Sequence, residues 1–310
     1  MHIAVISHHR LPVKGYGGPQ RVVVALVRGL VELGHRVTVI ATPGSKLPTA
    51  PVLEVAPRDH AGNKVAGFVP RDADIAHAHY PISTWPLPLP LVQTLHGNGK
   101  AGKPLPPNTV FLSRDHAARH GGTTFVHNGL VSTEFTFRRR KEAWSLFLGR
   151  LHSAKGYHWA IEAAKRTGRR LILAGGWRPS FSNEIKYVGE VDDKQKAALL
   201  ARARCLWTPA LWDEPFGLAS IEALFSGTPV IGTRRGAIPE IITPDVGALG
   251  DTLEELVEAS QQIHTRDPEC CRARAERLFS HTAMARRYVH VYESLLTSGN
   301  LPACPPAMES

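Results

Sequence analysis

The chain has 310 residues, enough for two modest domains, and its 43% hydrophobic and 21% charged residues are typical of a well-filled globular protein and exclude a disordered one. The net charge of +10 favours anionic ligands and leaves peripheral membrane contact open, but the basic residues are scattered and not interleaved with aromatics, which disfavours nucleic acid as the main partner. No run approaches the ~20 apolar residues of a membrane span, the N-terminus does not resemble a signal peptide, and the four cysteines form no C-x-x-C pair, so we expect a cytoplasmic protein.

The first half of the chain alternates strand and helix patterns. Residues 2–7 predict a strand, a loop rich in Gly and Pro follows, and apolar residues at helical spacing predict a helix from Pro19 to Leu33. A strand at 36–41 completes a βαβ unit, which implies a parallel sheet. Further strands are predicted at 52–55, 74–79, 91–96, 110–113 and 124–127.

A second series of the same kind follows a basic run at 138–141, which is typical of a linker. Its predicted strands are 144–148, 170–174, 187–188, 205–208 and 228–232, and its predicted helices are 158–167, 194–202, 217–226, 252–262, 268–278 and 283–296. Two such series predict an α/β protein with two facing Rossmann-like domains, parallel sheets and an interdomain cleft that holds the ligand. The expected parts are domains at 1–138 and 139–282, a helix at 283–297 that crosses back to the first domain, and a disordered tail at 298–310.

Two acids, Glu214 and Glu222, lie on either side of a predicted loop-to-helix junction. Pro215 and Gly217 place Glu214 before the helix and Glu222 on it. The free N–H groups at such a helix start can bind an anion, and a carboxylate about one turn further on can accept hydrogen bonds from vicinal hydroxyls. The alternative is an ordinary surface helix with an acid in its first turn.

The loop at 149–156 follows a strand, precedes a helix and has a glycine at each end. Arg150 and Lys155 could grip a diphosphate from two sides, the first through its planar fork and the second as a point charge. A solvated basic loop would have the same composition.

The loop after the first strand carries Gly17 and Gly18, which let backbone N–H groups approach a phosphate closely. It is not a G-x-G-x-x-G motif, because Arg21 stands where the last glycine would be.

His96 ends a predicted strand just before a glycine-rich loop. A histidine there can hydrogen-bond a substrate hydroxyl or exchange protons near neutral pH, and a packing role is the alternative. His77 and His79 share one strand face, which favours packing over metal ligation since no third ligand is evident nearby. Two short acid pairs could hold Mg²⁺ but are interpreted as loop and helix-start residues: Asp72/Asp74 and Asp192/Asp193.

Together these motifs resemble the family-4 retaining glycosyltransferases, which have the GT-B fold, over roughly residues 1–295. The shared motifs are the G-G loop at 17–18, His96-Gly97, G-R-L-x-x-x-K-G at 149–156, E-P-F-G-L-x-x-x-E at 214–222, the strand at 74–79 and the turn at 127–129. The paired acids with the G-R-L loop are specific, whereas the G-G loop alone is not. The chain is shorter than most members, and the missing length falls in the N-terminal half, which normally shapes the acceptor site.

The resemblance implies that residues 139–282 bind the nucleotide-sugar donor and residues 1–138 the acceptor. Its implied donor-binding residues are Gly17, Gly18, Gly149, Arg150, Lys155, Gly189, Val191, Glu214, Phe216, Gly217, Leu218 and Glu222. Its implied catalytic residues are His96, Arg150, Lys155 and Glu214. The implied reaction moves a hexose-type sugar from a nucleoside-diphosphate sugar, UDP by default, to a hydroxyl of a small molecule or glycan, with retention and without a metal or other cofactor.

Three other classes of protein would explain some of these sequence features. Another GT-B sugar-nucleotide enzyme, an epimerase or an inverting transferase, is disfavoured by the acids and cations together. A dinucleotide-dependent oxidoreductase would need a G-x-G-x-x-G turn and an acid ~20 residues later, and neither is cleanly present. A basic protein that binds nucleic acid or an anionic surface would have no need of Glu214 or Glu222.

Overall fold

The computed structural model describes residues 1–13, 15, 17–60, 64–99, 104–180 and 182–303. It divides into two compact units, one formed by Met1–Leu130 and Phe279–Ser310 and the other by Val131–Leu278. The sequence placed these boundaries later, after residue 138 and at residue 283. They lie earlier because the segments where the chain leaves and re-enters the first unit are hydrogen-bonded to each other at these residues. The backbone N–H of Leu130 donates to Phe279 O and that of His281 donates to Leu130 O, both at 2.9 Å.

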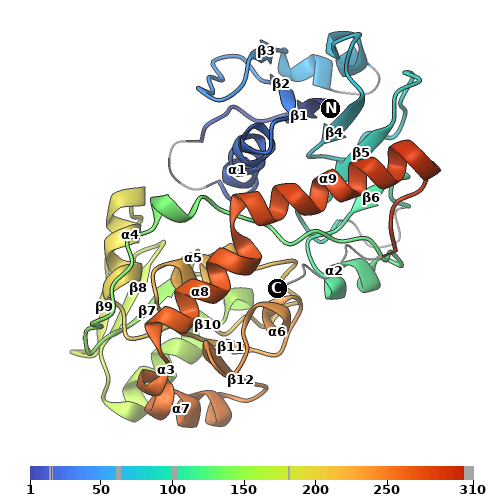
Figure 1. Ribbon diagram of the computed structural model, residues 1–310. Helices are drawn as coiled ribbons and strands as arrows, with labels where there is room; N and C mark the ends of the chain where they lie inside the picture. Colours follow the sequence, from blue (N-terminus) through green and yellow to red (C-terminus); the bar gives the residue numbers. More distant parts are fainter. Residues whose placement is uncertain (14, 16, 61–63, 100–103, 181, 304–310) are drawn as a thin grey trace. The chain divides into compact units, whose positions relative to one another are not determined.

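The first unit contains a six-stranded parallel sheet in the order β3-β2-β1-β4-β5-β6 (Figure 1). This is the strand order of a dinucleotide-binding Rossmann fold. Its strands are β1 (His2–Ile6), β2 (Arg36–Ala41), β3 (Val52–Glu54), β4 (Ile75–Ala78), β5 (Leu91–Thr94) and β6 (Thr109–Val110). Its helices are α1 (Gly18–Glu32), α2 (Arg114–Arg119) and α9 (His281–Ser298), with 3-10 turns η1 (Pro57–His60) and η2 (Lys64–Phe68).

Helix α9 packs beside α1 in this unit, as Figure 1 shows. Gly29 of α1 permits the close approach, since a Cβ there would lie 2.6 Å from the carbonyl oxygen of His281. The same helix reaches the sheet, because the Tyr292 hydroxyl contacts His77 Nδ1 at 2.7 Å. On the opposite face, Ala78 of β4 packs with Val65 of η2 in an apolar cluster.

The second unit repeats the pattern with the order β12-β11-β10-β7-β8-β9, also wholly parallel. Its strands are β7 (Ser145–Leu148), β8 (Leu171–Ala174), β9 (Ile185–Tyr187), β10 (Leu206–Thr208), β11 (Val230–Thr233) and β12 (Gly247–Gly250). Its helices are α3 (Tyr157–Thr167), α4 (Asp193–Arg202), α5 (Leu218–Phe225), α6 (Ile238–Ile241), α7 (Leu253–Gln262) and α8 (Pro268–Phe279), and its 3-10 turns are η3 (Ser132–Glu134), η4 (Ser153–Lys155) and η5 (Ile263–Thr265).

The α/β class and the parallel sheets predicted from the sequence are confirmed, but some elements differ. The expected strand at 124–127 is wrong, because only an isolated bridge from Phe111 to Phe125 joins that segment to the sheet. The expected strand at 110–113 ends early, because the Ser113 side chain accepts from His116 N and caps α2. Strand β12 was missed because its sequence, GALG, has little strand propensity.

The C-terminal segment is more ordered than the sequence suggested. Ser298 is the last residue of α9, and the Thr124 hydroxyl donates to Pro302 O at 2.5 Å, which ties the residues after the helix to the first unit. The rest of the expected tail, residues 304–310, lies outside the described residues. Among the described helices, none combines the length and apolar character needed to cross a bilayer.

Candidate functional site

The loop at 149–156 leaves the carboxyl end of β7 and turns into α3. Gly156 adopts a left-handed conformation with φ of 69°, and a Cβ there would overlap the carbonyl oxygen of Pro209, so the position requires glycine. The backbone N–H of Leu211 donates to Ala154 O at 2.8 Å, which joins this loop to the one after β10. The two loops predicted to bind the donor are therefore fixed side by side.

Lys155 and Glu214 meet where these loops join. Lys155 Nζ lies 2.5 Å from Glu214 Oε2, and the indole N–H of Trp212 donates to the same oxygen at 3.0 Å. The Lys155 ammonium also lies 4.9 Å from the centre of the Trp212 ring. The pair is partly buried, with 33% of the lysine side chain and 15% of the glutamate side chain exposed. Both groups are thus held in fixed positions but stay accessible to a ligand.

Glu222 lies on α5, one turn into the helix that follows Gly217. Its side chain is buried, and Oε1 accepts from Lys196 Nζ of α4 at 3.1 Å. Gly217 has φ of 94°, so glycine suits the turn that starts the helix. The first turn of α5 carries no acidic side chain, and the N–H groups of such a helix start favour an anion.

Sequence reasoning missed the roles of Lys196 and Trp212. Lys196 stands four positions after Asp192, the N-cap of α4, and it also contacts Asp193 at 3.2 Å. The capping pattern predicts the helix, but only the packing of α4 beside α5 brings the ammonium to Glu222. Trp212 adjoins the predicted acidic motif, and an indole N–H two positions before Glu214 is the signal in the sequence that points to it.

The other expected donor residues of this unit lie at the same edge of the sheet. Arg150 is exposed just after β7, and among the described residues no ion pair engages its guanidinium. Phe216 is buried before α5. Gly189 follows β9 with φ of 75°, and its carbonyl oxygen accepts a hydrogen bond from Gly175 N at 2.7 Å. Val191, two residues later, is half-buried. Gly149 is the first residue of the loop after β7, and Leu218 is the first residue of α5.

Gly17 and Gly18 lie at the start of α1 in the first unit. Gly17 is the N-cap, and its carbonyl accepts from Arg21 N at 3.1 Å. A Cβ on Gly17 would come within 2.7 Å of the Val13 side chain, so close packing of the loop favours glycine there. Both glycines are at the carboxyl edge of the first sheet.

His96 follows β5 at the same edge and pairs with His79, since His79 Nδ1 and His96 Nε2 are 2.9 Å apart. Burial lowers the pKa of His96 to about 3, with a smaller contribution from neighbouring imidazoles led by His9. Burial also holds the pKa of His79 well below its usual value. Both rings are neutral at physiological pH, so this geometry supports hydrogen bonding by His96 and not proton exchange near pH 7.

The contacts of His79 decide which nitrogen of each ring carries the proton. Among the described groups, His79 Nε2 is buried and has no hydrogen-bond partner. A proton on this nitrogen would leave a buried N–H donor without an acceptor. An unprotonated nitrogen there costs less free energy. His79 therefore carries its proton on Nδ1 and donates it to His96 Nε2, which leaves the His96 proton on Nδ1.

The candidate metal ligands have structural partners. His77 lies between the Tyr292 hydroxyl and the Thr94 hydroxyl, each at 2.7 Å. Asp74 accepts from His2 N, and Asp72 pairs with Arg36. Within the described ranges, no group of three His, Cys, Asp or Glu side chains is arranged to hold a metal ion.

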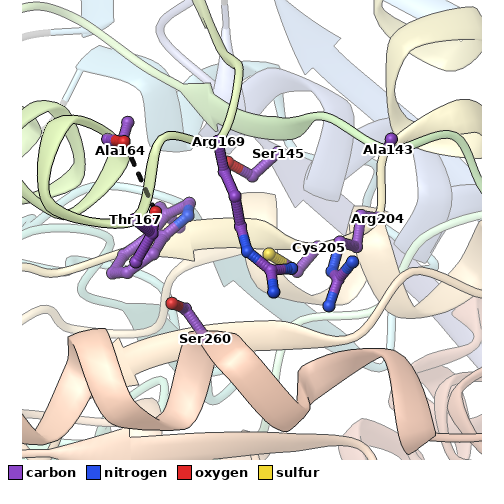
Figure 2. A pocket seen from close by; sticks show the side chains of 9 residues that line it. Ala143, Ser145, Ala164, Thr167, Arg169, Arg204, Cys205 and Ser260 are labelled. Carbon is purple, nitrogen blue, oxygen red and sulfur yellow. Dashed lines mark hydrogen bonds between the residues drawn. The ribbon is translucent and has the colours of Figure 1, made fainter. Parts of the chain in front are cut away.

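Figure 2 shows a small pocket at the opposite, amino-terminal edge of the second sheet. Arg169, Arg204 and Cys205 line it, and burial raises the pKa of the Cys205 thiol to about 12. Its volume of about 10 Å³ has room for little more than one water molecule. It contains none of the residues predicted to bind the donor.

The sequence matches known families in both units. Residues 16–126 match the family described as Glycosyltransferase Family 4, and residues 133–277 match Glycosyl transferases group 1. The crystal structure of AviGT4, a glycosyltransferase involved in avilamycin A biosynthesis, is 27% identical with a TM-score of 0.82, over 97% of this chain and 99% of that one. The motifs of this chain likewise resemble those of an avilamycin-pathway glycosyltransferase and its relatives within family 4.

Curated relatives are similar over shorter stretches. The GDP-mannose-dependent alpha-(1-6)-phosphatidylinositol dimannoside mannosyltransferase of Mycobacterium tuberculosis is 35% identical over 199 residues, which is 54% of this chain and 52% of that protein. The putative glycosyltransferase YtcC of Bacillus subtilis is 27% identical over 196 residues, 52% of this chain and 47% of that protein. The chain thus matches about half the length of these relatives. The two family matches, the two parallel sheets and the similarity to AviGT4 together show that this chain belongs to the GT-B glycosyltransferases.

Proposed function

We propose that the chain transfers a hexose-type sugar from a nucleoside-diphosphate sugar to a hydroxyl group, with retention of anomeric configuration and without a metal ion. The observation that carries the proposal is the arrangement at the carboxyl edge of the second sheet. There Lys155, Glu214 and the acid-free start of α5 lie together, with the buried Glu222 one turn away.

In this proposal each group acts on a part of the donor. Glu222 accepts hydrogen bonds from the ribose hydroxyls, and the backbone near Gly189 and Val191 receives the base. Glu214 contacts hydroxyls of the donor sugar. Arg150 and Lys155 bind the diphosphate, assisted by Gly149 and by the N–H groups of Phe216, Gly217 and Leu218. Gly17 and Gly18 contribute backbone N–H groups to the phosphate.

The proposed chemistry depends on charge stabilisation. Negative charge builds on the leaving nucleoside diphosphate in the transition state, and fixed cations with helix N–H groups can stabilise it in place of a metal. Lys155 is suited to this role because Glu214 and Trp212 already fix its ammonium. The acceptor attacks on the face that the diphosphate leaves, and a phosphate oxygen takes its proton. His96, as a neutral imidazole, donates a hydrogen bond from Nδ1 to the sugar.

UDP is our default donor base, from the motif resemblance. The mannosyltransferase of M. tuberculosis is named as GDP-mannose-dependent, so GDP-mannose is the second donor to test. The acceptor in our proposal is a small molecule or a glycan.

Binding is the first test. Thermal shift and calorimetry would be run with UDP, GDP, ADP, TDP, their common sugars and NAD(H), on wild type and Glu222→Ala. We expect one nucleoside diphosphate to stabilise the wild type selectively and the variant much less. Binding of NAD(H), or of no nucleotide, would overturn the proposal. With donor and acceptor in hand, the anomeric proton coupling of the product by NMR tests retention.

A further inference from the structure

A second pocket lies at the carboxyl edge of the sheet in the first unit. Its volume is about 620 Å³. Arg10 and Lys46 supply its cations, Pro12 and Val13 an apolar wall, and Gln20 of the first turn of α1 closes one side. The cations lie on the loops that follow β1 and β2, and parallel α/β sheets bind ligands at that edge.

The two cationic side chains project from loops that are bonded to each other. Arg10 Nε donates to Gly44 O at 3.0 Å, and the backbone N–H of Lys46 donates to Leu11 O at 2.8 Å. The backbone N–H of Leu11 donates in turn to the buried hydroxyl oxygen of Ser45 at 3.0 Å. The two loops that carry the cations are therefore held together before any ligand arrives.

The acid–base contacts of the described residues leave these two cations without a salt bridge. Over the described ranges, Arg10 and Lys46 form no ion pair. The acid that reaches this loop, Glu54, accepts from Gly44 N at 2.8 Å and is bonded there to backbone. Two cations that no described acid holds in a salt bridge, beside an apolar wall, favour a ligand with an anionic group on a carbon ring.

The pocket also adjoins the histidines of this edge. His9 lines it, and the His9 ring centre is 3.9 Å from that of His8. The charge of a protonated His9 or His8 contributes to the lowered pKa of His96, so the three imidazoles are electrostatic neighbours. A ring held in the pocket would therefore contact His9, an electrostatic neighbour of the residue that the proposed reaction uses.

We propose that this pocket binds the acceptor, and that the acceptor is a sugar or cyclitol carrying a phosphate group. Arg10 and Lys46 bind the phosphate, and Pro12 and Val13 contact the ring. The inference rests on the proposed function, because it names the acceptor class of that reaction. The donor diphosphate is the other source of phosphate in such a reaction, and the test separates the two.

The probes are glucose 6-phosphate and myo-inositol 1-phosphate, with glucose and myo-inositol as neutral counterparts. Their binding would be measured by calorimetry at low salt on wild type, Arg10→Gln and Lys46→Gln. Arg286→Gln is the matched control, because it removes one exposed positive charge from α9 of the same unit. The nucleoside diphosphate found in the panel above would be titrated into the same variants.

We expect a phosphorylated probe to bind more tightly than its neutral counterpart, and either pocket variant to weaken it about tenfold, as for loss of one charged hydrogen bond. Nucleotide affinity should be unchanged, as should all affinities of Arg286→Gln. Equal binding of charged and neutral probes, no binding of either phosphate, or an equal loss in the control would overturn the inference. A fall in nucleotide affinity would assign the cations to the donor and also overturn it. Failure of the proposed function would appear separately, as no nucleotide binding in the wild type.

Discussion

Replacement of Glu222 by alanine tests the assignment of the donor site most directly. The residue is 4% exposed, and in the proposed site its carboxylate would accept two hydrogen bonds from ribose hydroxyls. Hydrogen bonds to a charged group contribute about 1.5–3 kcal/mol each, so their loss should cost about 3–6 kcal/mol. We therefore expect Glu222→Ala to weaken nucleotide binding about 10²- to 10⁴-fold and to abolish measurable transfer.

The same change also breaks the contact with Lys196, which is 13% exposed and keeps Asp193 at 3.2 Å as a partner. Loss of a buried ion-pair partner costs about 3–5 kcal/mol of stability, with the lower end expected because Asp193 remains. Lys196→Ala separates this effect from direct binding, since it removes the same ion pair but leaves the carboxylate. We expect it to lower the free energy of unfolding similarly and to bind nucleotide more tightly than Glu222→Ala does.

Calorimetry gives the dissociation constants, and urea unfolding gives the stabilities. Glu258→Ala, which removes an exposed acid from α7 of the same unit, is the control and should behave as wild type in both. A folded Glu222→Ala protein that binds the nucleotide within threefold of wild type, about 0.6 kcal/mol, would refute the reasoning. Equal losses of affinity in Glu222→Ala and Lys196→Ala would show that the ion pair acts through the fold.

Four further outcomes are expected. Arg150→Ala should lower the rate about 10²-fold or more, because one preorganised cation at the leaving group is lost, and wild-type turnover would contradict its role. Treatment with EDTA should leave activity intact. A loss of activity that Mg²⁺ or Mn²⁺ restores would instead indicate a metal site at one of the acid pairs, Asp72/Asp74 or Asp192/Asp193. Gly156→Ala should lower stability by about 3 kcal/mol, because the added Cβ overlaps Pro209 O at a left-handed position, and an unchanged Tm would argue against this loop geometry. Stability should fall as the pH drops below 6.5, because burial lowers the pKa of His77 to about 3, so between these pH values only the unfolded chain protonates this imidazole. The expected loss at pH 5 is about 2 kcal/mol from His77 alone. In urea titrations, His77→Gln should reduce this pH dependence.

Local patterns in the sequence were sufficient for much of the fold. The helix that begins at Gly18 and the strand at 36–41 follow from apolar spacing with Pro19 and Gly34 as start and stop signals. Such signals act within a few residues, so they can be read without tertiary contacts. The strand β12 shows the limit of this reasoning, because Gly247 lies in the sheet where its missing side chain lets it approach Val230 O.

The sequence by itself determined the fold class and predicted candidate donor-binding residues, but not the roles of Lys196 and Trp212. Glycines and prolines set the loops after β7 and β10, and the motif from Glu214 to Glu222 places both acids near a helix start. Only the tertiary structure decided which side chains meet: Lys155 with Glu214, Lys196 with Glu222, and His79 with His96. These partners are 59, 26 and 17 positions apart in the chain. Packing of a parallel sheet brings the ends of distant strands to one edge, and burial there sets the protonation of the histidines, which no local pattern can specify.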